Sequence, residues 1–180
     1  MSRWCIAVRC LALVAALLMW PDRSHGRTQA HIVSRAAPHL FVLLGLGNNS
    51  PGLSELGSRI AQRGIQTTIA NYGEWQPLAR EAIREYKYDR LRSIMIIGHS
   101  LGGSAAAEMA AELGRSGVPV ELVVMLDPVG RSAIPYNVRR SVNIRPTRGE
   151  DHFSVIAAHE REIINYVLGA KGSRGISRRP

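Results

Sequence analysis

A serine flanked by glycines is the residue best suited to act as a nucleophile in this sequence. Gly98, Ser100 and Gly102 spell G-x-S-x-G, and the apolar run 94–97 precedes them. The alanine-rich stretch 105–113 follows them and predicts a helix. Strand, G-x-S-x-G and helix together predict a sharp turn that exposes the serine hydroxyl from a strained backbone. Ser100 is therefore the candidate nucleophile, at a helix N-terminus whose dipole favours developing negative charge.

A serine hydroxyl needs a neighbouring base, and the base needs a third group to orient it. Asp127 follows the apolar run 120–126, which predicts a strand, and is the candidate orienting acid. His152 lies in a polar loop after the next predicted strand and is the preferred base. His159 is the alternative base, but its charged neighbours at 160–162 are typical of a solvated helix face.

The four remaining histidines are placed poorly for this role. His25 and His31 precede the predicted fold, and His39 begins the first predicted strand, at the sheet edge opposite the site. His99 adjoins the nucleophile, so its side chain is expected to point elsewhere.

An acyl-transfer site also needs two N–H donors for the tetrahedral intermediate. Leu101, the residue after the nucleophile, is expected to supply one. The second is expected from Leu46, in the glycine-rich loop 45–52. That loop lacks the third glycine of a dinucleotide-binding loop and the lysine of a P-loop, which argues against a phosphate site.

The elements that must position these groups alternate between strands and helices. Strands are expected at 40–44, 66–70, 91–97, 120–126 and 141–145, and helices at 53–63, 77–88, 101–116 and 153–168. Short connections between them predict a three-layer α/β fold with a mainly parallel sheet of about five to six strands. Ligands bind at the carboxyl ends of such strands, where the glycine-rich loop, Ser100, Asp127 and His152 all fall.

The first 26 residues predict an export signal. Arg3 and Arg9 precede the apolar run 11–20, and small residues before and at Gly26 fit a cleavage site. The run is shorter than the roughly 20 residues of a membrane-spanning helix. We therefore expect an exported protein, periplasmic or secreted, with no stable membrane span after cleavage. An uncleaved N-terminal membrane anchor is the alternative.

The rest of the chain is expected to form one domain. Residues 27–37 read as a linker, 38–170 as the folded domain, and 171–180 as a disordered basic tail rich in Gly, Ser and Arg. Both cysteines, Cys5 and Cys10, precede the predicted cleavage site. Cleavage there would exclude disulfides, thiol nucleophiles and cysteine metal sites from residues 27–180.

The net charge of +9 is concentrated at the two ends of the chain. Residues 1–37 and 171–180 contribute +4 each, whereas 38–170 holds fourteen basic and thirteen acidic residues. The sequence has no basic stripe interleaved with aromatic residues, so a nucleic-acid partner is not expected.

These motifs resemble those of the α/β-hydrolase superfamily. The stretch 98–103, with the loop 45–47 before it and Asp127 and His152 after it, is similar to the small lipase, esterase and thioesterase members. The resemblance covers about 40–168. It implies that Ser100, Asp127 and His152 are nucleophile, acid and base, and that Leu46 and Leu101 form the oxyanion hole.

The resemblance implies a serine hydrolase that cleaves carboxylic esters or thioesters through an acyl-enzyme, without a cofactor or metal. The expected substrate is a small-molecule or lipid acyl ester. The chain departs from the superfamily in being short, without the antiparallel strands that usually come first. No cap domain fits, because only thirteen residues separate Asp127 from the next predicted strand. The alternatives are a non-catalytic binding protein on a degenerate hydrolase fold, or a transacylase.

Overall fold

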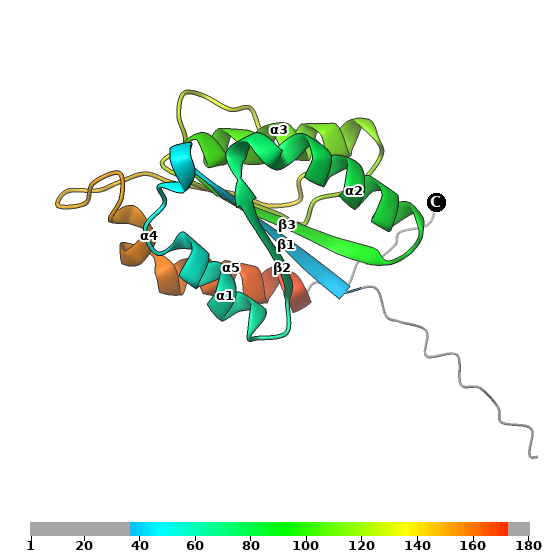
Figure 1. Cartoon of the computed structure of the whole chain (residues 1–180), viewed down its shortest axis with the longest axis horizontal. Coiled ribbons are helices and arrows are strands. Elements are labelled where there is room, and N and C mark those ends of the chain that lie inside the picture. The colour runs from blue at the N-terminus through cyan, green and yellow to red at the C-terminus, as the bar shows by residue number, and fades with distance from the viewer. Residues whose placement is uncertain (1–36, 173–180) are drawn as a thin grey trace, which may run out of the picture. The chain divides into compact units, whose positions relative to one another are not determined.

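A five-stranded, all-parallel sheet forms the centre of the molecule (Figure 1). The computed structural model describes residues 37–172, so the predicted signal peptide, nearly all of the linker and most of the basic tail lie outside it. The strands are β1 (Ala37–Leu44), β2 (Gln66–Asn71), β3 (Leu91–His99), β4 (Leu122–Leu126) and β5 (Ser141–Ile144). Their spatial order is β2-β1-β3-β4-β5. The predicted parallel α/β sheet is confirmed.

The sequence of each strand fits its place in the sheet. β1, β3 and β4 contain continuous apolar runs, and residues 40–44, 94–97 and 122–126 are buried. Strands covered on both faces have this pattern. β2 lies at one edge and carries Gln66, Thr67 and Thr68, which are polar and at least partly exposed. Edge strands tolerate such residues because one side faces solvent.

Helices cover both faces of the sheet (Figure 1). One face packs against α1 (Leu53–Ala61), α4 (Val155–Ala158) and α5 (Glu160–Gly172), and the other against α2 (Trp75–Lys87) and α3 (Leu101–Arg115). Two short 3-10 helices, η2 (Leu46–Asn48) and η3 (Tyr72–Glu74), follow β1 and β2. This is the predicted three-layer arrangement.

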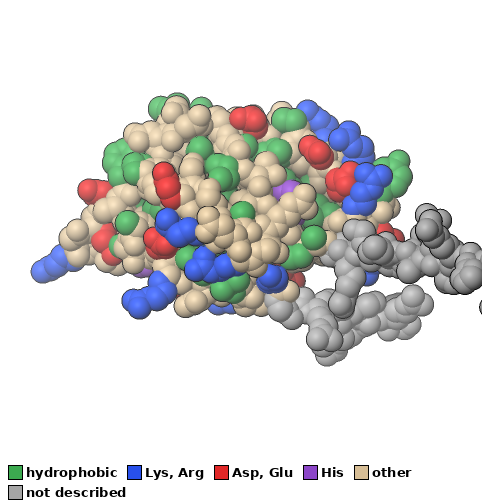
Figure 2. Space-filling model, turned by 60° about the horizontal axis from the view of Figure 1, so that its bottom comes forward, with side chains coloured by type: hydrophobic (Ala, Val, Ile, Leu, Met, Phe, Trp, Pro, Cys, Tyr) green, Lys and Arg blue, Asp and Glu red, His purple; other side chains and the backbone are tan. Residues whose placement is uncertain are grey.

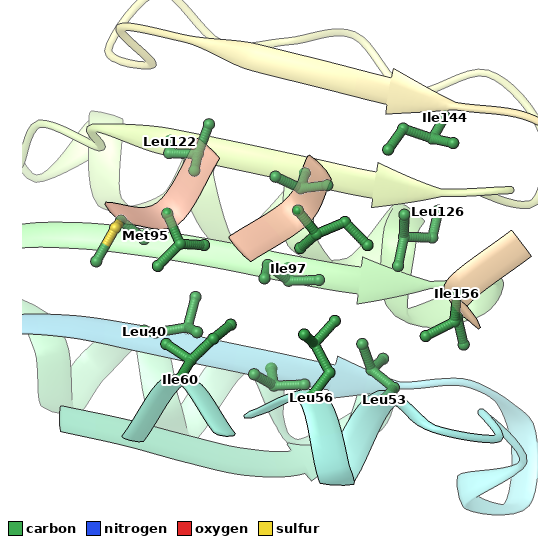
Figure 3. Packing of buried hydrophobic residues seen from close by; sticks show 14 of the residues in the cluster. Leu40, Leu53, Leu56, Ile60, Met95, Ile97, Leu122, Leu126, Ile144 and Ile156 are labelled. Carbon is green, nitrogen blue, oxygen red and sulfur yellow. The ribbon is translucent and has the colours of Figure 1, made fainter. Parts of the chain in front are cut away.

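Each face of the sheet has its own apolar core. On the α1 face, Leu53, Leu56 and Ile60 of the helix pack toward Leu40 of β1 and Ile97 of β3 (Figure 3). On the other face, alanines dominate the buried side of α3: Ala105, Ala106, Ala107 and Ala110. Such small side chains let α3 lie close to the strands that end at the candidate site.

Several expected element boundaries were wrong, and the clearest differences lie in the last helix and in β4. The last helix is interrupted at His159, which separates α4 from α5. α5 then continues through Gly169, whose surroundings leave open space, and includes two residues assigned to the tail. β4 begins only at Leu122, and Val120 instead forms an isolated bridge with Val138. A glycine ends a helix when the backbone turns left-handed, as Gly64 does at φ +75° after α1, but Gly169 has no such φ.

The segment between β4 and β5 is irregular, so no cap domain is built there, as expected.

Acidic and basic side chains are interspersed on the face shown in Figure 2. Within residues 37–172, no helix combines the length and apolar character needed to cross a membrane.

Candidate active site

The turn between β3 and α3 holds Ser100 in a strained conformation. Its φ of 58° and ψ of −123° are rare for a residue with a side chain. The two flanking glycines are required sterically. A Cβ atom on Gly98 would lie 2.0 Å from the carbonyl oxygen of Gly102, and one on Gly102 would lie 2.1 Å from that of Leu43. This tight packing fixes Ser100 at the carboxyl edge of the sheet.

Asp127 lies immediately after β4, the strand beside β3, and also has a positive φ of 42°. The loop that follows Asp127 is bonded to the Ser100 turn. Val129 N–H donates to the Ser100 carbonyl at 3.3 Å, and Ser104 Oγ donates to the Val129 carbonyl at 2.7 Å. Asp127 and Ser100 therefore stand on adjacent, mutually braced loops.

The Asp127 carboxylate binds two cationic or potentially cationic side chains. His152 Nδ1 lies 2.6 Å from Oδ2, and Arg145 Nη1 lies 3.0 Å from Oδ1. Burial alone would raise the pKa of Asp127, but hydrogen bonds from His152 and Arg145 outweigh it and hold that pKa below its ordinary value. An ionised carboxylate only accepts hydrogen bonds, so His152 Nδ1 must carry the proton. In the neutral ring, Nε2 is then free to accept another proton.

The turn that holds Ser100 and the loop that holds His152 are in contact through His99, the residue before Ser100. The ring of His99, which precedes Ser100, lies 4.6 Å from the ring of His152. Within residues 37–172, no hydrogen bond is recorded between Ser100 Oγ and His152 Nε2. Such contacts are often long in unliganded sites and shorten in the substrate complex.

The alternative base, His159, has different partners. Its Nδ1 lies 2.9 Å from Glu162 Oε2, and its Nε2 lies 3.5 Å from Glu150 Oε2. The hydrogen bond that His159 donates to Glu162, with support from Glu150, raises the pKa of His159. His159 therefore joins the junction of α4 and α5 to the preceding loop through an acidic cluster.

The two expected oxyanion donors begin helices. Leu46 is the first residue of η2, and Leu101 is the first residue of α3. First-turn N–H groups have no partner within their own helix, and neither helix is capped by a side chain. A Cβ atom on Gly45 would lie 3.2 Å from Ser100 Cβ, so the η2 loop lies directly against the Ser100 turn.

Arg145 and Ser50, two polar residues around this site, were not predicted from the sequence, and His99 was expected only to point away from the nucleophile. Arg145 binds Asp127, and its position just after β5 is the signal that could have revealed it. Ser50 and His99, the last residue of β3, form a buried hydrogen bond of 2.9 Å although they are 49 residues apart in the chain. No sequence pattern predicts such a pair, because only the tertiary fold brings the two residues together.

In the part of the chain that the structure describes, no group of three or more His, Cys, Asp or Glu residues is arranged to hold a metal ion.

Comparison with known proteins supports the architecture. No protein-family model matches the chain, and no curated protein matches it. Among solved structures, a protein from Xanthomonas campestris pv. campestris that is described as belonging to the α/β hydrolase superfamily matches with a TM-score of 0.51 and 12% identity. The match covers 73% of this chain and 96% of that protein. The chain therefore has the fold of the α/β-hydrolase superfamily, as its sequence motifs predicted.

Proposed function

We propose that this protein is a serine hydrolase that cleaves carboxylic esters or thioesters. The observation that carries the proposal is the 2.6 Å hydrogen bond from His152 Nδ1 to Asp127, on loops braced against the strained Ser100 turn. Strained backbone is retained where the surrounding structure enforces it, often at reactive residues. An imidazole that is oriented by an acid can activate a serine hydroxyl within its reach, and Ser100 is half-buried at the same sheet edge.

In the proposed reaction, Ser100 Oγ attacks the acyl carbon and its proton passes to His152 Nε2. Asp127 stabilises the imidazolium that forms, and the N–H groups of Leu46 and Leu101 bind the oxyanion. His152 then protonates the leaving alcohol or thiol, which departs as the acyl-enzyme forms. A water molecule, deprotonated by His152, attacks the acyl-enzyme, and collapse of the second intermediate releases the acid and returns the proton to Ser100.

The surroundings of the site support an ester with an apolar acyl group as the substrate. Three large apolar side chains beside the candidate residues are exposed: Leu46 at 66%, Val129 at 51% and Phe153 at 44%. Leu46 follows Gly45 at the Ser100 turn, Val129 binds the Ser100 carbonyl, and Phe153 packs edge-on against His152 at 5.1 Å. Because no cap covers them within residues 37–172, they offer an open apolar rim to a small or lipid acyl ester.

We also propose that the protein acts after export, in the periplasm or outside the cell, on the basis of the apolar run 11–20. Fractionation of cells expressing the full chain tests this, with the mass of the recovered protein showing whether residues 1–26 are removed.

Hydrolysis of nitrophenyl esters of increasing acyl length tests the enzymatic proposal. We expect Ser100→Ala and His152→Ala each to lower kcat by about 10⁴-fold or more, as loss of a triad member does. His159→Ala is the matched histidine control and should retain activity. If His159→Ala alone abolishes hydrolysis, His152 is not the base.

The two alternatives predict different results in the same experiments. A binding protein on this fold would bind esters without turning them over. A transacylase would transfer the acyl group to an added alcohol in preference to water, which product analysis by mass spectrometry would show.

A further inference from the structure

The side chain of His99 is fully buried beneath the candidate site and joins two of its loops. Nδ1 lies 2.9 Å from Ser50 Oγ, and Nε2 lies 2.7 Å from the backbone carbonyl oxygen of His152. Ser50 is also buried, and its Oγ accepts a hydrogen bond from Gly45 N–H at 2.9 Å. The reaction proposed above uses neither the His99 ring nor the Ser50 hydroxyl.

The chemistry of these groups gives the chain of hydrogen bonds one direction. A carbonyl oxygen can only accept, so His99 Nε2 must carry a proton. Burial lowers the pKa of His99, which keeps the ring neutral and leaves Nδ1 as an acceptor. Ser50 Oγ–H therefore donates to Nδ1 and accepts from Gly45 N–H with its lone pair. The chain runs from Gly45 through Ser50 and His99 to the carbonyl of His152.

This chain of hydrogen bonds begins and ends in the two loops that a serine hydrolase must hold in place. Gly45 precedes Leu46, the expected oxyanion donor, and His152 is the expected base. Its backbone is fixed by His99 while its ring is fixed by Asp127, so both the position and the rotation of the imidazole are constrained. The link between them passes through the residue next to Ser100.

We propose that His99 and Ser50 are positioning residues that lock the oxyanion loop and the base loop to the nucleophile turn. This inference rests on the proposed function, because it assigns His99 and Ser50 to the support of that reaction. Buried hydrogen bonds that hold reacting groups in register can be worth about 100-fold in rate when a displacement of about 1 Å is avoided.

Three variants and one control test this positioning role through nitrophenyl ester hydrolysis. Ser50→Ala removes the hydroxyl, His99→Gln retains a group that can reach the His152 carbonyl, and His99→Asn retains one that can reach Ser50. Each should lower kcat by about 10- to 100-fold with little change in KM, because positioning acts on the reaction step and not on substrate binding. Thr68→Val is the matched control. It removes a hydroxyl bonded to His39 at 2.8 Å at the other end of the sheet, and should leave kcat unchanged.

Two further readouts distinguish a positioning role from a merely structural one. Rates are expressed per site titrated with a fluorophosphonate, so loss of folded protein does not count as loss of kcat. The double variant Ser50→Ala with His99→Gln should lose less rate than the two single losses combined, because each single variant already loses the hydrogen bond between Ser50 and His99. Fully additive losses of rate in the double variant would contradict the positioning role. A wild-type kcat per titrated site in Ser50→Ala would also contradict it.

Nitrogen NMR of the histidine-labelled wild-type protein tests the same inference if the variants fail to fold. We expect the His99 ring to be neutral with its proton on Nε2, and a proton on Nδ1 would overturn the inference. An inactive wild-type protein that does not react with the fluorophosphonate would contradict the proposed function and the positioning role with it. An active wild type with an equally active, folded Ser50→Ala would contradict the positioning role alone.

Discussion

At the scale of single residues, the conformation of Ser100 is the feature that most distinguishes this site from an ordinary strand-to-helix turn. Asn48 and Asp89 also have positive φ, but Asn and Asp tolerate it well. Serine at φ 58° and ψ −123° is strained. The turn keeps a conformation that glycine would adopt more easily, which fits selection for the hydroxyl.

Replacing Ser100 should therefore separate stability from activity. We expect Ser100→Gly to be more stable than Ser100→Ala by about 1 kcal/mol, because glycine relieves backbone strain whereas alanine retains it. Both should be inactive. Urea denaturation measures the difference, and a Ser100→Gly variant less stable than Ser100→Ala would contradict the assigned strain.

The role of Asp127 predicts a large loss of rate without loss of fold. In Asp127→Asn the amide can donate to His152 Nδ1, which reverses the favoured tautomer and removes the charge that stabilises the imidazolium. We expect kcat for ester hydrolysis to fall by about 10³- to 10⁴-fold. The matched control is Asp151→Asn, which retains an oxygen that can accept from Phe153 and Ser154 N–H and should stay within about twofold of wild type. Equal activity of the two variants would exclude Asp127 as the acid.

At the scale of elements, the site depends on how closely β3, α3 and β1 approach one another. The main-chain contacts that a side chain would meet at Gly98 and Gly102 leave no room to adjust. We expect Gly98→Ala to lower the free energy of unfolding by about 3 kcal/mol or more. Gly169→Ala, in open space on α5, should raise it by about 0.5–1 kcal/mol because alanine favours the helix. Thermal or urea denaturation of both variants measures these opposite changes in stability. A Gly98→Ala variant as stable as wild type would contradict the close packing at this turn.

The His159 cluster makes the attachment of α5 dependent on pH. Glu162 and Glu150 raise the pKa of His159, so the folded protein binds its proton more tightly than the unfolded chain. This stabilisation is fully present below the unfolded pKa of about 6.5 and is lost as pH rises through the higher folded pKa. We expect wild type to exceed His159→Gln in stability more at pH 5 than at pH 9, by up to about 1 kcal/mol. A difference that does not vary with pH would contradict the ion pairs.

At the scale of the whole molecule, the order of strands and helices was predictable, whereas the contacts between loops were not. Continuous apolar runs and glycine-marked turns determine β1, β3, β4 and the Ser100 turn, because strong local patterns and burial agree there. The break at His159 was missed because the apolar periodicity continues across it. Arg145 and Ser50 were overlooked, and the partners of His99 were not foreseen, because these residues become neighbours only when the sheet edge assembles.

The same architecture explains why the reaction class is better supported than the identity of the substrate. The structure places at one sheet edge the strained turn at Ser100, the histidine bound to Asp127 and the helix starts at Leu46 and Leu101, but the connection after β4 builds no cap over them. In the proposed reaction, substrate choice would depend on the exposed apolar side chains of Leu46, Val129 and Phe153. Its apolar character favours acyl groups that are themselves apolar.

The most direct test of the central claim is covalent labelling of the folded protein with a fluorophosphonate, followed by peptide mapping. Cleavage after Arg92 and Arg115 yields a peptide that contains Ser93, Ser100 and Ser104, and fragmentation assigns the adduct among them. We predict one adduct, on Ser100, that is absent from Ser100→Ala and strongly slowed in His152→Ala. Folded wild-type protein that takes no label, or labelling that persists in Ser100→Ala, would contradict the assignment of Ser100 as the nucleophile.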